Sequence, residues 1–304
     1  MQAQTETQDE IGSLVRVEKN LRLDHVVGQE EAVRRLRELV NRISYSQIFD
    51  LWGVEKPRAI ALTGPPGVGK TFSIRALANE ASCPLLELQY EDISSHLLDE
   101  SIRRLAAFKE QVNALSRLEG HVLVLIDEAD SFFQNRFDQH AHPADKKKTN
   151  FFLRWLDGDL EGSSNFTLVV TSNAWETVDP ALRRSGRFIE IEYQPLTSDD
   201  IKKALKVHMS LAELAAGRTL FAEFNLDDFE LPDGITGADV KQIVSDVCLQ
   251  KAGEFLEEYK ASEEKSVDLS DQYLISSDEF KETAYNYASK LNLFKKRTAG
   301  FGRH

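Results

Sequence analysis

The sequence contains little cysteine and no long apolar run. Its two cysteines, Cys83 and Cys248, stand far apart, so neither a disulfide framework nor a cysteine-rich zinc site is expected. No apolar stretch approaches the roughly 18 residues that a membrane-spanning helix needs. The first ten residues, MQAQTETQDE, are polar and acidic, unlike a signal peptide. These absences indicate a reducing compartment, and we expect a cytoplasmic protein without a membrane span.

Basic residues are also scarce relative to acidic ones. The chain has 37 Lys and Arg against 50 Asp and Glu, which gives a net charge of −13. This balance argues against broad affinity for nucleic acid or anionic lipid, although it is compatible with a local basic patch. The 304 residues, 41% of them hydrophobic, are enough for two domains with a substantial core.

Residues 24–194 alternate short, apolar, β-rich runs with helical stretches. Near-continuous apolar strands separated by helices predict an α/β domain with a mostly parallel sheet covered on both faces. The predicted strands lie at residues 58–63, 84–89, 121–126, 166–172 and 188–193. Residues 1–23 are too few for a domain and are predicted to form an N-terminal arm or a short helix.

Beyond residue 194 the strand pattern stops and helix-start signals take over. Three capping boxes, each followed by an amphipathic run, predict three helices. They pair Thr197 with Asp200, Thr236 with Asp239, and Ser276 with Glu279. We therefore expect a small all-helical domain at 195–292, followed by a basic, flexible tail at 293–304.

The segment GPPGVGKT, residues 64–71, fits the phosphate-binding pattern G-x-x-x-x-G-K-[ST] between a strand and a helix. Backbone N–H groups at a helix N-terminus suit phosphate oxygens. Lys70 is expected to reach the β- and γ-phosphates, and the Thr71 hydroxyl to ligate Mg²⁺. The competing interpretation is a Gly-rich turn with an exposed lysine. The predicted nucleotide contacts are Pro66, Gly67, Val68, Gly69, Lys70, Thr71 and Phe72.

Two later strands end in polar residues. HVLVLIDEAD places Asp127 at a strand end, where its carboxylate can hold Mg²⁺, and Glu128 one residue further, where it can polarise an attacking water. TLVVTSN ends in Asn173, which can then hydrogen-bond the γ-phosphate or the water. The alternatives are a capped helix start that uses Asp127 and Asp130, and an ordinary asparagine turn at Asn173.

GPPGVGKT, LIDEAD, TSN and DPALRRSGRF occur in the order and spacing of the AAA ATPases, within the larger AAA+ group, and the chain resembles this family from about residue 24 to 290. The resemblance implies the sheet order 5-1-4-3-2, a helical lid domain, ATP and Mg²⁺ as cofactors, and a hexameric homo-oligomer. It also implies further nucleotide contacts at Val27, Gly28, His208, Gly237 and Ala238.

The resemblance also gives a role to the arginine-rich connector at 179–188. By match to R-x-G-R, Arg184 and Arg187 correspond to arginines that reach a neighbouring subunit's nucleotide and stabilise the transition-state charge. Arg183 falls on a position that the pattern leaves free. The alternative is pairing within the chain, of Arg187 with Glu190 or Glu192 and of Arg183 with Asp179, which would contribute only about 0–1 kcal/mol.

The predicted function is an ATP-hydrolysing motor that remodels, unfolds or disassembles a protein. Lys70, Glu128, Asn173, Arg184 and Arg187 are the predicted catalytic residues. Leu97 and Leu98 stand where relatives grip a threaded chain, but they are equally compatible with a helix start, and residues 134–150 favour a solvated loop whose lysines could attract an acidic substrate. The alternatives are a loader or initiator in DNA metabolism, against which the acidic balance counts, and an ATP-gated assembly scaffold. No specific nucleic-acid partner is predicted.

Overall fold

A computed structural model of the chain describes residues 11–54, 56–93, 98–133, 143–158, 165–184, 186–223, 235–261 and 273–300. Contacts divide the chain into an α/β unit, which ends at Gln194, and a helical unit, which begins at Pro195; residues 67–69 group with the helical unit. The two units are described separately below.

The α/β unit contains one sheet with the strand order β1-β3-β4-β5-β2-β6. Apart from β1, every strand pairs in parallel with its neighbours. The predicted order 5-1-4-3-2 is confirmed for the five expected strands. The strand bounds are β1 (Ser13–Leu14), β2 (Ala59–Thr63), β3 (Leu85–Glu87), β4 (Val122–Ile126), β5 (Phe166–Ser172) and β6 (Ile189–Glu192).

Strand β1 comes from the segment predicted to be an arm. Ser13 and Leu14 pair antiparallel with Glu87 and Leu86 of β3 at the sheet edge. Ile11 packs against the main apolar cluster. At Gly12, where φ is +76°, an added Cβ would lie 2.7 Å from the Phe108 ring. Residues 11–14 are therefore integrated into the sheet unit, which the short and polar sequence of the segment did not indicate.

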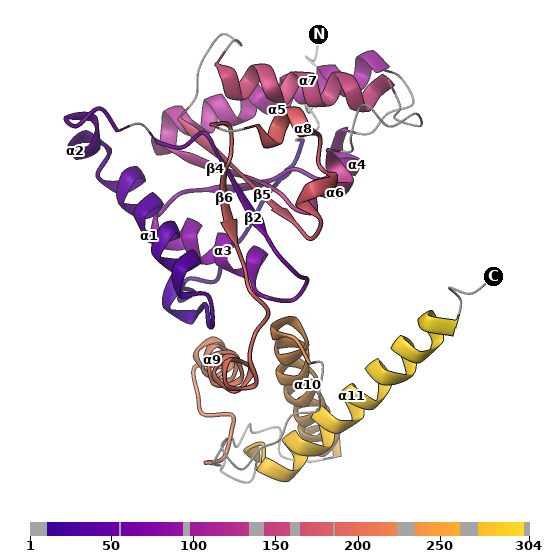
Figure 1. Ribbon diagram of the computed structural model, residues 1–304. Helices are drawn as coiled ribbons and strands as arrows, with labels where there is room; N and C mark the ends of the chain where they lie inside the picture. Colours follow the sequence, from indigo (N-terminus) through magenta and orange to yellow (C-terminus); the bar gives the residue numbers. More distant parts are fainter. Residues whose placement is uncertain are drawn as a thin grey trace, which may run out of the picture. The chain divides into compact units, whose positions relative to one another are not determined.

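Helices α5 and α7 cover one face of the sheet, and α1 and α3 cover the other (Figure 1). All five residues of β2 and of β4 are buried, as expected for parallel strands with both faces covered. The helices of this unit are η1 (Leu23–His25), α1 (Glu30–Ser44), α2 (Ser46–Asp50), α3 (Lys70–Glu80), α4 (Tyr90–Ile93), α5 (Leu98–Glu119), α6 (Ala129–Phe132), α7 (Pro143–Asp157), η2 (Trp175–Thr177) and α8 (Pro180–Arg183).

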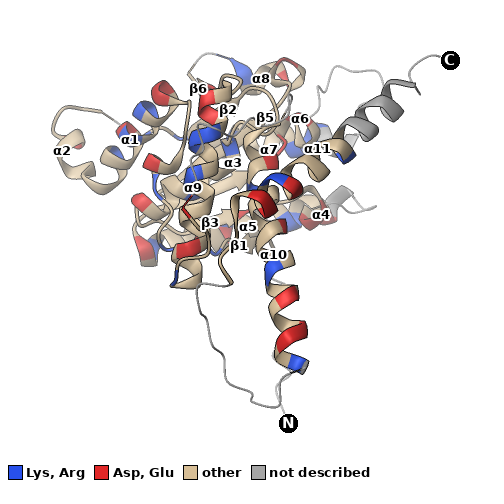
Figure 2. Cartoon of the chain, turned by 90° about the horizontal axis from the view of Figure 1, so that it is seen from below, with Lys and Arg blue, Asp and Glu red and all other residues tan. Residues whose placement is uncertain are grey.

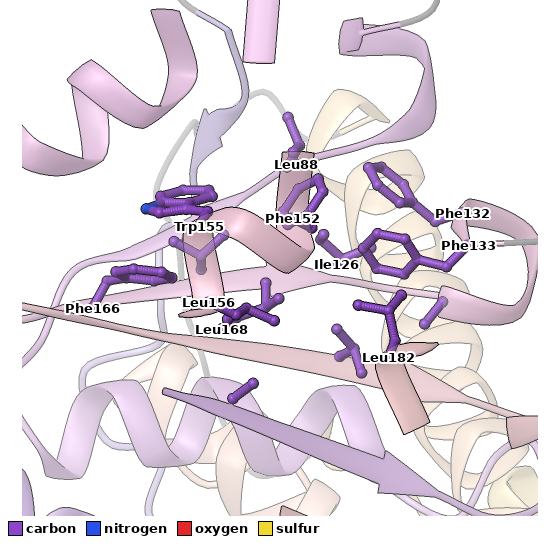
Figure 3. Close-up of a cluster of buried hydrophobic side chains, with 14 of the residues drawn as sticks. Leu88, Ile126, Phe132, Phe133, Phe152, Trp155, Leu156, Phe166, Leu168 and Leu182 are labelled. Atoms are coloured by element: carbon purple, nitrogen blue, oxygen red, sulfur yellow. The ribbon is translucent and has the colours of Figure 1, made fainter. Parts of the chain in front are cut away.

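The core between the sheet and the α5–α7 layer is rich in aromatic residues (Figure 3). Alternate residues of each strand face this layer, because successive side chains of a strand point to opposite faces. The Trp155 ring stacks on Phe166 with 4.5 Å between the ring centroids. Phe132 and Phe133 contact Phe152 edge-on, with centroid distances of 5.8 and 5.1 Å. These contacts fix α6 and α7 relative to the strand ends that carry the candidate site.

The lysine-rich segment differs from its prediction. Residues 134–142 lie outside the described residues, but α7 begins at Pro143, so Lys146, Lys147 and Lys148 are helical. Lys148 is only 4% exposed, and its ammonium lies 4.4 Å from the centre of the Tyr90 ring and 4.7 Å from that of Phe132. The prediction of a loop is wrong for all three residues, because they are helical. The prediction of a solvated side chain is wrong only for Lys148, whose buried cation is stabilised by the aromatic faces, whereas Lys146 and Lys147 are exposed. Leu97 lies outside the described residues, and Leu98 begins α5.

The helical unit contains α9 (Ser198–Ala216), α10 (Gly237–Ala261) and α11 (Ser277–Gly300). Its apolar cluster joins the three helices, with Leu205, Val240 and Phe280 almost fully buried. Charges of both signs are interspersed along α10 (Figure 2). Helix α11 continues to Gly300, into residues predicted to be a flexible tail, because this segment has no helix breaker before that glycine. Among the described residues, none of the helices combines the length and apolar character that crossing a bilayer requires.

All three predicted capping boxes are present. The Thr197 hydroxyl accepts from the Asp200 N–H at 3.2 Å, and the Thr236 hydroxyl accepts from the Asp239 N–H at 3.3 Å. The Ser276 N–H donates to Glu279 at 2.6 Å, and Lys251 donates to the same carboxylate at 2.6 Å. Burial alone would raise the pKa of Glu279, but these hydrogen bonds outweigh burial and lower the pKa to about 2.

We expect the substitution Glu279→Gln to weaken the helical unit in a pH-dependent way. The folded-state pKa lies below the ordinary value of 4.5, so the charge stabilises the fold above about pH 4.5, and this contribution is lost as the pH falls toward 2. Glutamine keeps the capping geometry, so the change isolates the charge. Urea unfolding of both proteins should show a deficit at pH 7 that closes below pH 4.5. Glu282→Gln, an exposed site on the same helix, is the control. A deficit independent of pH would contradict this account.

Candidate functional site

The candidate site lies where β2, β4 and β5 end. Their parallel register pairs Thr63 with Ser172 and Ile126 with Val170, so the loops after these strands emerge at the same sheet edge. The loop after β2 leads into α3, the loop after β4 into α6, and β5 continues into Ser172 and Asn173. The topology therefore brings three separately predicted motifs together, as expected at the carboxyl edge of such a sheet.

The loop after β2 begins at a glycine that no other residue can replace without strain. Gly64 has φ of +137°, and an added Cβ would lie 2.4 Å from the carbonyl oxygen of Tyr193. The Gly64 N–H donates to Ser172 at 3.2 Å, and the Tyr193 N–H donates to Thr63 at 2.7 Å. Gly67 and Gly69 also have positive φ angles, of +76° and +99°. The glycines of GPPGVGKT thus meet backbone requirements of the turn into α3.

Lys70 is the central charge of the site and is only 7% exposed. Its ammonium donates to the carbonyl oxygens of Gly64 and Pro65, both at 2.7 Å, and to Asn173 Oδ1 at 2.8 Å. Burial lowers the pKa of Lys70, while the carboxylates of Asp127 and Asp130 act in the opposite direction. The alternative of an exposed lysine in an ordinary turn is therefore wrong. The lysine directly connects the loop after β2 with the end of β5.

Thr71 and Asp127 form the second contact of the site. The Thr71 hydroxyl lies 3.2 and 3.0 Å from the two carboxylate oxygens of Asp127 and donates to them. A hydroxyl and a carboxylate are oxygen ligands of the kind that Mg²⁺ prefers, together with phosphates and waters. The structure thus brings together the two residues predicted to hold the ion.

Glu128 has a backbone conformation that is unusual for its residue type. Its φ and ψ are both 55°, in the left-handed region, and it forms the N-cap of α6. Non-glycine residues seldom adopt this conformation, and such strain is concentrated at functional sites. The Glu128 side chain is exposed at the sheet edge, beside Asp127 in the sequence.

Two further residues hold these groups in place: Thr171, which the sequence did not single out, and Asp130, which the sequence offered only as a helix cap. The Thr171 hydroxyl donates to the Asp127 carboxylate and accepts from the Glu128 N–H at 3.1 Å. The Asp130 carboxylate accepts from the Ser172 hydroxyl at 2.8 Å and from the Asn173 N–H at 3.2 Å. Both contacts join β4 to β5 across more than 40 residues of sequence. Only the adjacency of these two strands could have indicated them.

The three arginines of the connector at 179–188 differ in their contacts. Arg187 donates to both carboxylate oxygens of Asp157, at 3.1 and 2.8 Å, and to the Ala181 carbonyl at 2.7 Å. The hydrogen bond from Arg187 lowers the pKa of Asp157. Arg183 donates to the Val178 carbonyl at 2.8 Å. Arg184 is exposed, and its guanidinium has no hydrogen-bond or ion-pair partner within the described ranges. Pairing within the chain therefore occurs, but with Asp157 rather than Glu190 or Glu192.

The remaining predicted nucleotide contacts lie in two separate places. Val27 and Gly28 precede α1, and Gly28 has φ of +69°. The next residue, Gln29, is buried and exchanges hydrogen bonds with the backbone of Gln194, at 2.7 and 3.0 Å, which fixes this segment beside the end of β6. His208 is half-buried on α9, and Gly237 and Ala238 begin α10. These last three belong to the helical unit.

A glycine-rich strand–loop–helix segment with a buried lysine, next to a threonine–aspartate pair, defines a P-loop nucleotide-binding domain. Residues 60–196 match the family described as "ATPase family associated with various cellular activities (AAA)". Residues 60–196 therefore form a domain of the AAA ATPase family, and the resemblance predicted from the motifs is confirmed.

The curated relatives are similar to most of this chain. Protein SAV of Sulfolobus acidocaldarius is 31% identical over 271 residues, 88% of this chain and 32% of the relative. The proteasome-activating nucleotidase of Methanothermobacter thermautotrophicus is 28% identical over 241 residues, 77% of this chain and 56% of the relative. The ATP-dependent zinc metalloprotease FtsH 1 of Thermomicrobium roseum is 28% identical over 235 residues, 75% of this chain and 34% of the relative. The chain thus spans from about a third to somewhat over half of these relatives.

We expect Thr171→Val to destabilise the α/β unit, because it leaves the Glu128 N–H, which is in a partly buried contact, without its acceptor and removes one donor from Asp127. Losing such a partner typically costs about 1–3 kcal/mol in the free energy of unfolding. Thr171→Ser keeps the hydroxyl and should retain most of the stability. Urea unfolding of the three proteins measures the difference. Equal stability of the Val and Ser variants would show that the hydroxyl contacts contribute nothing.

Proposed function

We propose that the chain binds ATP with Mg²⁺, hydrolyses it, and uses the cycle to remodel a protein substrate. The observation that carries the proposal is the convergence of Lys70, Thr71–Asp127, Glu128 and Asn173 at one sheet edge. The names of two relatives, an ATP-dependent metalloprotease and a proteasome-activating nucleotidase, support ATP as the nucleotide and a polypeptide as the target.

Each residue of the site has a role that follows from its chemistry. The positive charge of Lys70 suits the oxygens on which charge accumulates in phosphoryl transfer. Thr71 and Asp127 would hold Mg²⁺, which neutralises phosphate charge when bound. The Glu128 carboxylate accepts hydrogen bonds and can take a proton from water, and the Asn173 amide can orient that water. Pro66, Gly67, Val68, Gly69 and Phe72, with Val27, Gly28, His208, Gly237 and Ala238, remain the proposed nucleotide contacts.

The proposal also includes a second copy of the chain, on whose nucleotide the arginines of the 179–188 connector would act. Arg184 has an exposed guanidinium without a described partner, so it is available to a neighbouring subunit. Arg187 is held by Asp157 and would first have to exchange that partner. We therefore assign the contact with a neighbouring subunit's nucleotide chiefly to Arg184. Because such a contact is heterologous, its repetition gives a ring or a spiral, and we propose the hexamer that the resemblance implies. The cytoplasmic location remains a prediction from the sequence.

We expect Glu128→Gln to bind ATP normally but to hydrolyse it about 10²–10⁴-fold more slowly, because the amide cannot accept the proton from water. Phosphate release and nucleotide affinity are measured on the same preparation. Glu119→Gln, at the exposed end of α5, is the control. A variant that hydrolyses ATP at the wild-type rate would contradict the assignment of Glu128. An ATP-gated scaffold predicts that this variant still performs its cellular task, whereas a motor predicts a trapped substrate.

We expect Arg184→Ala to retain ATP binding and to lose about 10³-fold or more of its hydrolysis rate, since the guanidinium would act on a neighbour's nucleotide. Arg183→Ala, at the adjacent exposed arginine, is the matched control. Mixing Arg184→Ala with Lys70→Ala should restore part of the rate, because one variant then supplies the intact site and the other the arginine. Full activity of Arg184→Ala, or no recovery in the mixture, would contradict action between subunits.

A further inference from the structure

A groove on the α/β unit is not used by the nucleotide site. Helices α5 and α7 lie side by side on one face of the sheet (Figure 1), and between them is a cavity of about 500 Å³. This size falls within the range of sites that bind small ligands or single large side chains. Its lining residues come from the N-terminal half of α5 and from α7. We call it the α5–α7 groove.

The rim of the groove is cationic. Arg103 on α5 and Lys147 and Arg154 on α7 line it, and no Asp or Glu is among the described lining residues. Arg103 and Arg154 are exposed, and neither side chain has a hydrogen-bond or ion-pair partner in the described part of the chain. In a chain with a net charge of −13, three cations around one cavity are a local reversal of sign. Such a rim attracts carboxylates, which arginine can bind through two parallel hydrogen bonds.

The floor of the groove is apolar and well supported. Ile102, Ala106 and Phe151 line it, and Ile102 and Phe151 also pack against the main core. The Phe151 ring lies 6.0 Å from Phe152 and 6.1 Å from Trp155, measured between ring centroids. A floor held by buried aromatic residues is preformed, so a ligand does not have to order it. The groove therefore combines an anion-binding rim with an apolar surface.

We propose that the α5–α7 groove binds an acidic peptide segment that carries a bulky apolar residue. The apolar residue packs on Ile102 and Phe151, and the flanking carboxylates pair with Arg103 and Arg154. The inference rests on the proposed function in one respect, since it names the class of polypeptide on which the motor would act. It differs from that function in using none of the nucleotide-site residues.

The test is peptide binding by the full chain without nucleotide. The probe is a fluorescein-labelled peptide with one phenylalanine between two runs of four glutamates. Its binding is measured by fluorescence anisotropy. We expect Arg103→Glu with Arg154→Glu to weaken binding by about tenfold or more, because both attractive pairs become repulsive. Arg117→Glu, an exposed arginine near the end of α5, should bind as wild type. A peptide with alanine in place of phenylalanine, and one with glutamines in place of glutamates, should each bind more weakly.

Equal binding by the double variant and wild type would overturn the proposal. So would equal binding of the glutamine peptide, or a thymine oligonucleotide that competes as well as the peptide, since the groove would then bind anions of any kind. ATP hydrolysis by the double variant should be unchanged. If the wild-type chain binds the peptide but lacks hydrolysis, the motor proposal fails and the groove stands. If hydrolysis is present without specific peptide binding, only the groove proposal fails.

Discussion

The three hydrogen bonds of the Lys70 ammonium are the contact on which the rest of the candidate site depends. Two of them hold the carbonyl oxygens at the start of the loop after β2, and the third holds Asn173 after β5. A buried ammonium needs hydrogen-bond partners, and these three oxygens occupy all of its donors in the structure. The lysine therefore fixes the spacing between two motifs that lie about a hundred residues apart. The same positive charge is what a phosphate would find at this edge.

The parallel sheet makes this contact possible. Because β2, β4 and β5 run in one direction, their carboxyl ends meet at one edge, and each polar residue that ends a strand is brought beside the next. The links between β4 and β5, through Thr171 and Asp130, then set the side chains on that edge. Glu128, which follows β4, has a left-handed backbone conformation, and its N–H donates a hydrogen bond to the Thr171 hydroxyl.

The sequence predicted the parts that local patterns determine. The five apolar strands, the phosphate-binding loop and the three capping boxes follow from residues close together in the chain, and the structure contains them. Strand β1 was missed because two exposed residues carry no periodic signal. The burial of Lys148 and the pairing of Arg187 with Asp157 were missed for another reason. The burial of Lys148 and the Arg187–Asp157 pair both depend on residues that lie elsewhere in the sequence. Lys148 also shows that a run of lysines can include a buried side chain.

The arginines of this acidic chain have different environments. Arg187 is partly buried and pairs with a carboxylate through two hydrogen bonds, so it supports the connector on which Arg184 stands. Arg103 and Arg154 stand exposed around an apolar floor, where no carboxylate lines the cavity. In the described part of the chain, the arginines that pair with a carboxylate are Arg34, Arg35, Arg37, Arg104 and Arg187. The lack of an acidic partner alone does not mark a binding surface; Arg103 and Arg154 are distinguished by the cavity with apolar lining that they share.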